Sequence, residues 1–149
     1  MPSHVVRAAF VDDAPALIEL YRQMVPEAEM PSTEAAAGVI QELSDREGHH
    51  LLVAEVDGKV VGTVTLVVVP NITHAARPWA QVENMVVLDE YRRRGIGRAL
   101  IERCAELTRK AGGYDMQLIS SAHRKEAHAF YESCGFRPDP RGFRMFIER

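Results

Sequence analysis

An apolar strand, a basic turn and a glycine-opened helix follow one another between Glu83 and Leu100, and this order strongly constrains the fold. The segment reads as a strand up to Leu88, a turn of Arg92, Arg93 and Arg94, and a helix that begins around Gly95 and Gly97. Glycine lets the backbone approach an anion closely and adopt dihedral angles that a Cβ forbids. The first turn of a helix offers unpaired N–H groups and the positive end of the dipole. Together with the arginines, this order predicts a cradle for a phosphorylated ligand.

The spacing of the glycines separates three kinds of phosphate loop. A nucleoside-triphosphatase loop would place Lys and Ser or Thr after Gly97, where Arg98 and Ala99 stand. A dinucleotide loop would need a third glycine at Leu100. The remaining pattern, R-x-x-G-x-G, resembles the pyrophosphate loop of the GNAT superfamily of N-acetyltransferases. The resemblance implies acetyl-CoA as co-substrate, held by Arg92, Arg93, Arg94, Gly95, Ile96, Gly97 and Arg98. The alternative is a glycine-started helix with a solvated basic end.

A second motif lies about 30 residues further along the chain. Residues 127–136 read A-H-A-F-Y-E-S-C-G-F and resemble the A-x-x-F-Y-E-x-x-G-F helix near the C-terminus of GNAT domains. Ala127, Phe130, Tyr131 and Cys134 fall on one helical face, and Gly135 is expected to end the helix. Alone, the motif could be a short core-packing helix with a buried aromatic residue. The two motifs together, in family order, identify the chain as a member of that superfamily.

Hydrophobic periodicity predicts a mixed α+β fold with the order β-α-α-β-β-β-α-β-α-β-β in one domain, residues 1–149. Strands are expected at 5–8, 50–56, 60–69, 79–88 and 114–120, near Phe136 and at 143–147. Helices are expected from Asp12 or Asp13 to Met24, over 32–47, 95–111 and 125–134, with a polar loop at 70–78. The resemblance implies the GNAT-like acyl-CoA N-acyltransferase fold, a central, mostly antiparallel mixed sheet flanked by helices. In that family the strands on either side of the loop and its helix splay apart around the pantetheine arm.

Composition and charge narrow the class of protein further. No apolar run approaches the roughly 20 residues of a membrane span, and the N-terminus lacks the form of a signal peptide, so a cytoplasmic location is expected. Cys104 and Cys134 fall on apolar helix faces and are expected to be small buried residues. Residues 12–47 hold nine acidic and two basic residues (−7), whereas residues 92–110 hold seven basic and two acidic ones (+5). This asymmetry suits an anionic cofactor with a cationic co-substrate, although both regions could be solvated helix faces.

Glu83 is the candidate general base for acetyl transfer to an amine. Strand alternation predicts that it shares a face with Met85 and Val87. A carboxylate among such apolar neighbours would take up a proton near neutral pH, as a base must. The resemblance implies the same role, because a glutamate on this strand activates the amine in many GNAT enzymes, often through water. The alternative is an edge carboxylate that faces solvent or pairs with an arginine.

Other roles at the site are implied by the resemblance. Backbone groups of Met85, Val86 and Val87 would stabilise the oxyanion and hold the pantetheine arm. Tyr131 matches the family tyrosine that protonates the departing thiolate; otherwise it is a core tyrosine whose hydroxyl is satisfied elsewhere. Arg124 stands where many members carry a cofactor-contacting asparagine, which leaves that contact in question. The run from His123 to Tyr131 resembles members that acetylate small amines, including aminoalkylphosphonates.

The motifs predict an enzyme: an acetyl-CoA-dependent N-acetyltransferase that acts on the primary amine of a small molecule by direct attack in a ternary complex. The second hypothesis is an acyl-CoA-binding sensor or regulatory module without turnover, and the presence of both Glu83 and Tyr131 favours the enzyme. No metal site is expected, because no histidine pair has the H-E-x-x-H form. No nucleic acid or membrane partner is expected either. The acceptor stays open, and the resemblance makes a homodimer possible.

Overall fold

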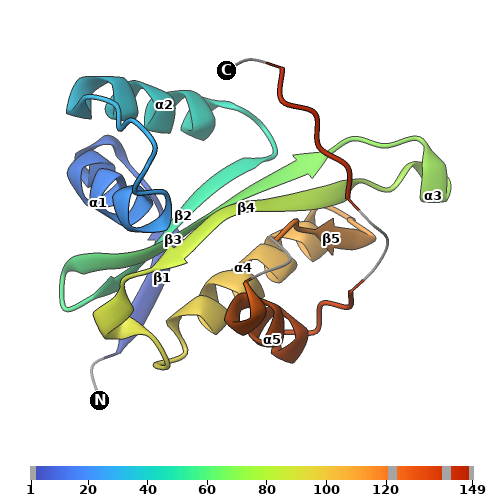
Figure 1. The fold of residues 1–149 in the computed structure, drawn as a ribbon. Coiled ribbons are helices and arrows are strands. Elements are labelled where there is room, and N and C mark those ends of the chain that lie inside the picture. Colours follow the sequence, from blue (N-terminus) through green and yellow to red (C-terminus); the bar gives the residue numbers. More distant parts are fainter. Residues whose placement is uncertain (1–2, 121–123, 139–141, 148–149) are drawn as a thin grey trace. The chain divides into compact units, whose positions relative to one another are not determined.

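The structure is a computed structural model that describes residues 3–120, 124–138 and 142–147 (Figure 1). The chain divides into two compact units, residues 1–117 and 118–149, and each is described by itself. The first unit contains β1 (His4–Ala8), α1 (Ala14–Met24), α2 (Thr33–Asp45), β2 (His49–Val56), β3 (Lys59–Val69), α3 (Thr73–Ala76), β4 (Trp79–Val87), α4 (Ile96–Lys110) and β5 (Asp115–Gln117). The second unit contains α5 (Lys125–Ser133). No described helix is long and apolar enough to cross a membrane.

The five strands form one mixed sheet in the order β1-β2-β3-β4-β5. The first four strands run antiparallel to their neighbours, and β5 pairs with β4 in parallel. Asp57 and Gly58 form the hairpin turn between β2 and β3, with φ values of 49° and 80°, as the Asp-Gly pair predicts. The mixed α/β fold that the sequence predicted is therefore confirmed.

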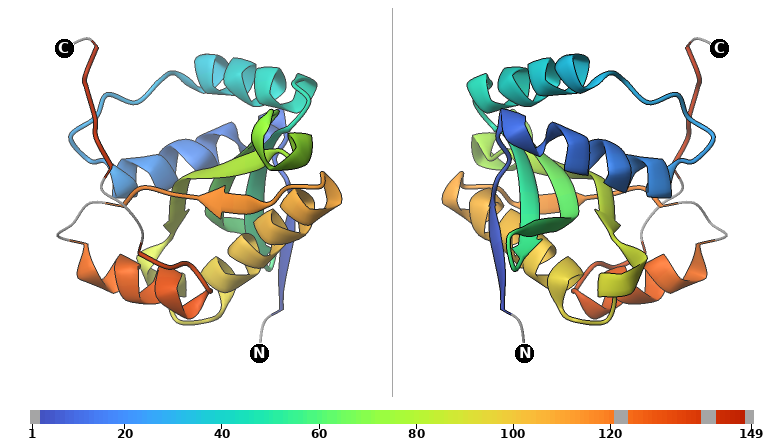
Figure 2. Two further views of the ribbon diagram at one scale, coloured as in Figure 1. Left: turned by 90° about the vertical axis from the view of Figure 1, so that its right-hand side faces the viewer. Right: turned by 90° about the vertical axis from the view of Figure 1, so that its left-hand side faces the viewer.

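Helices cover both faces of this sheet (Figures 1 and 2). α1 and α2 lie on one face and α4 on the other. The core between α1 and the sheet is built around Leu17 and Leu20, and the α4 side around Leu100 and Cys104, all at most 2% exposed. Burial raises the pKa of Cys104 to about 12, so this thiol stays protonated and apolar, as expected. α2 begins where Ser32 Oγ accepts a hydrogen bond from the Ala35 N–H at 3.1 Å, a standard N-cap.

Two expectations about secondary structure need correction. The predicted loop 70–78 contains a single left-handed turn, in which His74, Ala75 and Ala76 have φ values of 54°, 59° and 61°. Among the described residues 136–138 and 142–147 there is no strand, although strands were predicted near Phe136 and over 143–147. An apolar segment becomes a strand only when its backbone pairs with a neighbour. Phe143 and Ile147 are 92% and 85% exposed, so their apolar character alone does not create that pairing.

Candidate active site

A β-bulge interrupts β4 at the candidate site. Thr63 of β3 pairs with Val86, and Thr65 pairs with Glu83. One residue of β3, Val64, therefore stands opposite two residues of β4, Asn84 and Met85. Asn84 has a φ of 51°, the left-handed conformation that asparagine tolerates better than most side chains. The extra residue reverses the alternation of side chains along the rest of the strand.

The bulge corrects the predicted face of Glu83. Glu83 lies opposite Thr65, whereas Val87 lies opposite Gly62, on the other face of the sheet. The Gly62 face is covered by α4, because a Cβ at Gly62 would lie 3.2 Å from Ile96 Cγ2. Glu83 thus lies on the face of the sheet that α1 covers, together with Val86, and not on the same face as Met85 and Val87. Alternation fails here because it assumes one residue of β4 for each residue of β3.

The surroundings of Glu83 are polar and open to solvent. Its side chain is exposed, and its Oε1 accepts a hydrogen bond from Gln81 Nε2 at 3.1 Å. Tyr21 of α1 reaches the same face: burial raises the pKa of its hydroxyl, and hydrogen bonds to the Thr63 and Thr65 side chains partly offset this rise. The predicted apolar setting is therefore wrong, and the carboxylate instead meets solvent beside a strip of hydroxyl groups.

The outer edge of β4 is paired only at its start within the described residues. β5 pairs with Trp79, Ala80 and Gln81 and no further. The pairing of these two parallel strands therefore ends before the bulge. Within the part of the chain that the structure describes, one edge of the second half of β4 has no strand partner.

Backbone groups of Val87 face this unpaired edge. The Leu88 N–H donates to the Val61 carbonyl at 2.8 Å. Hydrogen-bonded and non-hydrogen-bonded pairs alternate along an antiparallel ladder, so Val86 is bonded to β3 through Thr63 and Val87 points away from β3. Of these two residues, Val87 is thus the one that can offer its N–H to an extended ligand, because its carbonyl already accepts a hydrogen bond from Gln23 Nε2.

The glycine loop at the end of β4 has the backbone geometry expected of the predicted cradle. A short 3₁₀ turn (Asp89–Tyr91) leads to Arg92, Arg93 adopts a left-handed φ of 62°, and α4 begins at Ile96. Gly95 caps the helix with a φ of 80°, a conformation in which an L side chain is strained. The N–H groups of the first helical turn, including those of Ile96 and Gly97, have no intrahelical acceptor.

Arginine side chains surround this helix end. Arg92, Arg93, Arg94 and Arg98 are all exposed. Arg92 Nη2 pairs with Asp89 Oδ1 at 3.1 Å, and the Arg94 guanidinium lies over the Tyr91 ring at 5.0 Å. Exposed cations around free backbone N–H groups fit a pyrophosphate, and the unpaired β4 edge fits the amide-bearing arm of acetyl-CoA. The described residues therefore suit this co-substrate.

Helix α5, in the second unit, carries Tyr131 and Arg124. It ends in a Schellman motif, in which the Phe136 N–H donates to the Tyr131 carbonyl and the Gly135 N–H to the Glu132 carbonyl. Gly135 has a φ of 100°, so the predicted helix end is confirmed. The Tyr131 ring packs edge-on against Phe136 at 5.8 Å. Burial raises the pKa of Tyr131, and the charge of Arg124 opposes this rise; the hydroxyl is therefore protonated near neutral pH.

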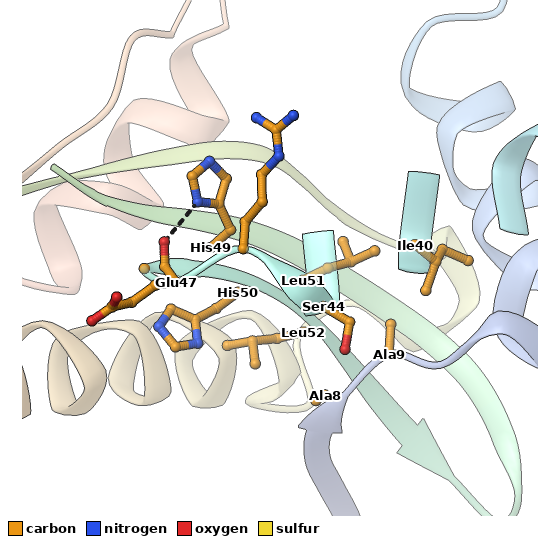
Figure 3. A pocket seen from close by; sticks show the side chains of 11 residues that line it. Ala8, Ala9, Ile40, Ser44, Glu47, His49, His50, Leu51 and Leu52 are labelled. Atoms are coloured by element: carbon orange, nitrogen blue, oxygen red, sulfur yellow. Dashed lines mark hydrogen bonds between the residues drawn. The ribbon is translucent and has the colours of Figure 1, made fainter. Parts of the chain in front are cut away.

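A separate pocket of about 290 Å³ lies beside the turn between α2 and β2 (Figure 3). Ile40 and Leu52 line it together with His49 and His50. Burial, with the nearby charge of Arg103, lowers the pKa of His50. None of the predicted site residues lines this pocket, and no metal-binding group of His, Cys, Asp and Glu occurs in the described parts of the chain.

Two residues near the candidate site, Tyr21 and Gln23, were not predicted from the sequence. Gln23 forms hydrogen bonds with the backbone at Val87 and Asp89. No local pattern could have revealed these contacts, because each joins residues more than 40 positions apart in the chain.

Comparisons with known proteins agree with this geometry. Residues 14–136 match the family model of the acetyltransferase (GNAT) family. Glucosamine 6-phosphate N-acetyltransferase of Trypanosoma brucei brucei is 36% identical over 59% of this chain, which spans 58% of that enzyme. Aminoglycoside N(6′)-acetyltransferase type 1 of Stenotrophomonas maltophilia is 30% identical over 96% of this chain and 94% of its own length.

A solved structure shows the same fold over nearly the whole chain. It is a putative acetyltransferase from Agrobacterium tumefaciens, with a TM-score of 0.90 and 39% identity, covering 95% of this chain and 99% of the other. The cradle, the parted strands and these similarities lead to one assignment. The chain belongs to the GNAT family of N-acetyltransferases, which use acetyl-CoA as co-substrate.

Proposed function

We propose that this protein transfers the acetyl group of acetyl-CoA to the primary amine of a small molecule by direct attack in a ternary complex. The observation that carries this proposal is the bulge at Asn84. It presents Glu83 on the α1 face of the sheet just before the unpaired edge of β4 and the Arg92–Gly97 cradle.

Each candidate residue has a separate role in this mechanism. Acetyl-CoA supplies the acetyl group as a thioester. Glu83 accepts the proton of the amine, directly or through water, and the amine nitrogen bonds to the carbonyl carbon as the C–S bond breaks. Backbone N–H groups near Met85 and Val87 stabilise the carbonyl oxygen. Tyr131 gives its proton to the departing sulfur. Arg92 to Arg98 and the first turn of α4 hold the pyrophosphate, and Arg124 adds a cation at the start of α5.

The charge of the chain and the activities of its relatives support a choice of first acceptors to test. The acidic first third of the chain suits a cationic amine. Glucosamine 6-phosphate, an aminoglycoside and an aminoalkylphosphonate are therefore the first amines to test. Release of coenzyme A with one of them, above a control without amine, is the expected result. Acetyl-CoA binding without turnover on a broad amine panel would instead indicate the sensor module.

The cradle can be tested without knowing the acceptor. Arg92→Ala should weaken acetyl-CoA binding by roughly 1–3 kcal/mol if the guanidinium makes a charge-assisted bond. Gly97→Val should block the approach of the pyrophosphate to the helix. Titration calorimetry measures both effects, and wild-type affinity in both variants would remove the loop from the site.

A further inference from the structure

The carboxamide of Gln23 joins helix α1 to the end of β4. Its Nε2 donates to the Val87 carbonyl at 3.0 Å, and its Oε1 accepts from the Asp89 backbone N–H at 3.1 Å. Gln23 lies in the last turn of α1 and is half-buried. Both polar ends of one side chain are thus engaged by two backbone groups of a segment 64 and 66 residues away.

The two backbone groups that Gln23 engages are the pair that one residue of a neighbouring parallel strand would bond. In a parallel pair, the N–H of one residue donates to the carbonyl of residue i−1 on the neighbouring strand, and its own carbonyl accepts from the N–H of residue i+1 on that strand. Val87 and Asp89 hold these positions around Leu88. β5 is the parallel neighbour of β4, but its ladder stops at Gln81. The carboxamide of Gln23 therefore makes the two hydrogen bonds that a peptide group of a parallel strand would make, at a position on β4 beyond the end of its pairing with β5.

This contact fixes the start of the turn that leads into the cradle. Asp89 is the first residue of the 3₁₀ turn, and its carboxylate pairs with Arg92. A bond to the Asp89 N–H therefore restrains the backbone three residues before the arginine that opens the R-x-x-G-x-G loop.

We propose that Gln23 is a positioning residue for the pyrophosphate cradle, holding the 88–92 turn in the conformation that binds acetyl-CoA. The inference rests on the proposed function and adds a residue to the same site. It differs from a competing role, in which Gln23 occupies the β4 edge and the pantetheine arm must displace it. In the positioning role, loss of the carboxamide weakens the binding of the phosphate end of the cofactor. In the competing role, that loss strengthens binding.

The test uses two ligands that share the phosphate end. Acetyl-CoA is titrated directly, and 3′-phospho-ADP, which keeps the pyrophosphate but lacks the arm, is measured by displacement of acetyl-CoA. Gln23→Ala should raise the Kd of both ligands by a similar factor of about 5- to 30-fold, as expected for two lost hydrogen bonds. Gln23→Glu keeps the length and the acceptor but loses the donor to Val87, so it should also bind more weakly than wild type.

Gln41→Ala is the matched control. Gln41 also uses its carboxamide on a helix, donating from Nε2 to Asp45 Oδ1 at 3.0 Å, but it lies on the exposed face of α2. This variant should bind both ligands as wild type does. Thermal melts of all variants report folding separately, and the altered Kd should persist at temperatures where each variant is fully folded.

The outcomes are distinct. Unchanged affinity for acetyl-CoA in Gln23→Ala, tighter binding, or weaker binding of acetyl-CoA with unchanged 3′-phospho-ADP would each overturn the positioning role. Failure of 3′-phospho-ADP to displace acetyl-CoA from the wild type would overturn it as well. Failure of wild-type protein to bind acetyl-CoA would overturn the proposed function itself.

Discussion

Glu83 and Tyr131 illustrate how the setting of a side chain determines the chemistry it can perform. Glu83 is exposed and accepts a hydrogen bond from Gln81, so its carboxylate is accessible to an amine or to a bridging water. Tyr131 is half-buried against Phe130 and Phe136, which favours the neutral hydroxyl. An accessible carboxylate suits the proposed base, and a protonated phenol suits the proposed acid.

Replacing Glu83 with glutamine tests the base. Glu83→Gln keeps the shape but cannot accept a proton, so kcat should fall about 10²–10⁴-fold while acetyl-CoA affinity stays nearly constant. Steady-state kinetics across pH and calorimetry on the same protein give both values. Glu102→Gln, an exposed carboxylate on α4, is the control and should behave as wild type. A pH–rate profile that stays unchanged in Glu83→Gln would assign proton transfer to another group.

Tyr131→Phe tests the acid, because it removes one oxygen and leaves the ring packing in place. The free energy of unfolding should change by about 1 kcal/mol or less, while kcat should fall by roughly 10²-fold or more. Thermal melts and kinetics on one preparation measure the contrast. Turnover within about twofold of wild type would leave Tyr131 as a packing residue.

At the scale of elements, the β4 bulge is the feature that arranges the site. It reverses the side-chain alternation beyond Glu83, so the carboxylate faces α1 while Val87 faces α4. The left-handed φ of Asn84 is the conformation that makes this exchange possible.

Two substitutions at Asn84 should separate backbone conformation from side-chain chemistry. Asn84→Gly accepts a φ of 51° without strain, so stability and activity should stay close to wild type. Asn84→Val places a β-branched residue in the left-handed region, which should cost about 1–2 kcal/mol and lower kcat/KM by misorienting Glu83. Urea unfolding and kinetics measure the pair. Equal activity in both variants would show that the bulge does not orient the catalytic group.

At the scale of the whole molecule, a charged cluster ties the N-terminal strand to the rest of the sheet. Arg7 of β1 donates to both oxygens of Asp13, at 2.8 and 3.0 Å, and to Glu55 of β2 at 2.7 Å. The Phe10 N–H also donates to Asp13, whose side chain is 7% exposed. Burial alone would raise the pKa of Asp13, but these hydrogen bonds and the charge of Arg7 outweigh it and lower the pKa.

This cluster predicts a pH-dependent stability. Because the pKa of Asp13 is lower in the folded than in the unfolded protein, its contribution is complete above the unfolded value of about 4 and is lost as pH falls through the folded value. Asp13→Asn should therefore cost about 2–3 kcal/mol at pH 7, and the difference from wild type should shrink below about pH 4. Denaturant titrations at several pH values measure this difference in the free energy of unfolding.

Glu42→Gln, which removes an exposed ion pair with Arg46, is the control and should cost at most about 0.5 kcal/mol. A pH-independent cost at Asp13 would contradict the charge-based explanation.

The sequence by itself determined the features that depend on neighbouring residues. The strand, basic turn and glycine-capped helix from β4 to α4 and the Gly135 helix end were predicted and are present. Each follows from local preferences, such as the glycine that tolerates a positive φ or the apolar residues that repeat along one helical face. The family resemblance came from the same local motifs.

Only the tertiary structure decided which groups meet across the sheet. The register between β3 and β4 puts two residues opposite Val64, and this reversed the predicted face of Glu83. The contacts of Tyr21 with Thr63 and Thr65, and of Gln23 with Val87, likewise join segments far apart in the chain. A pattern read along one segment assumes a regular partner strand and cannot register an extra residue or a side chain that arrives from another helix. For that reason the backbone geometry of the glycine loop could be predicted from the sequence, whereas the orientation of the candidate base could not.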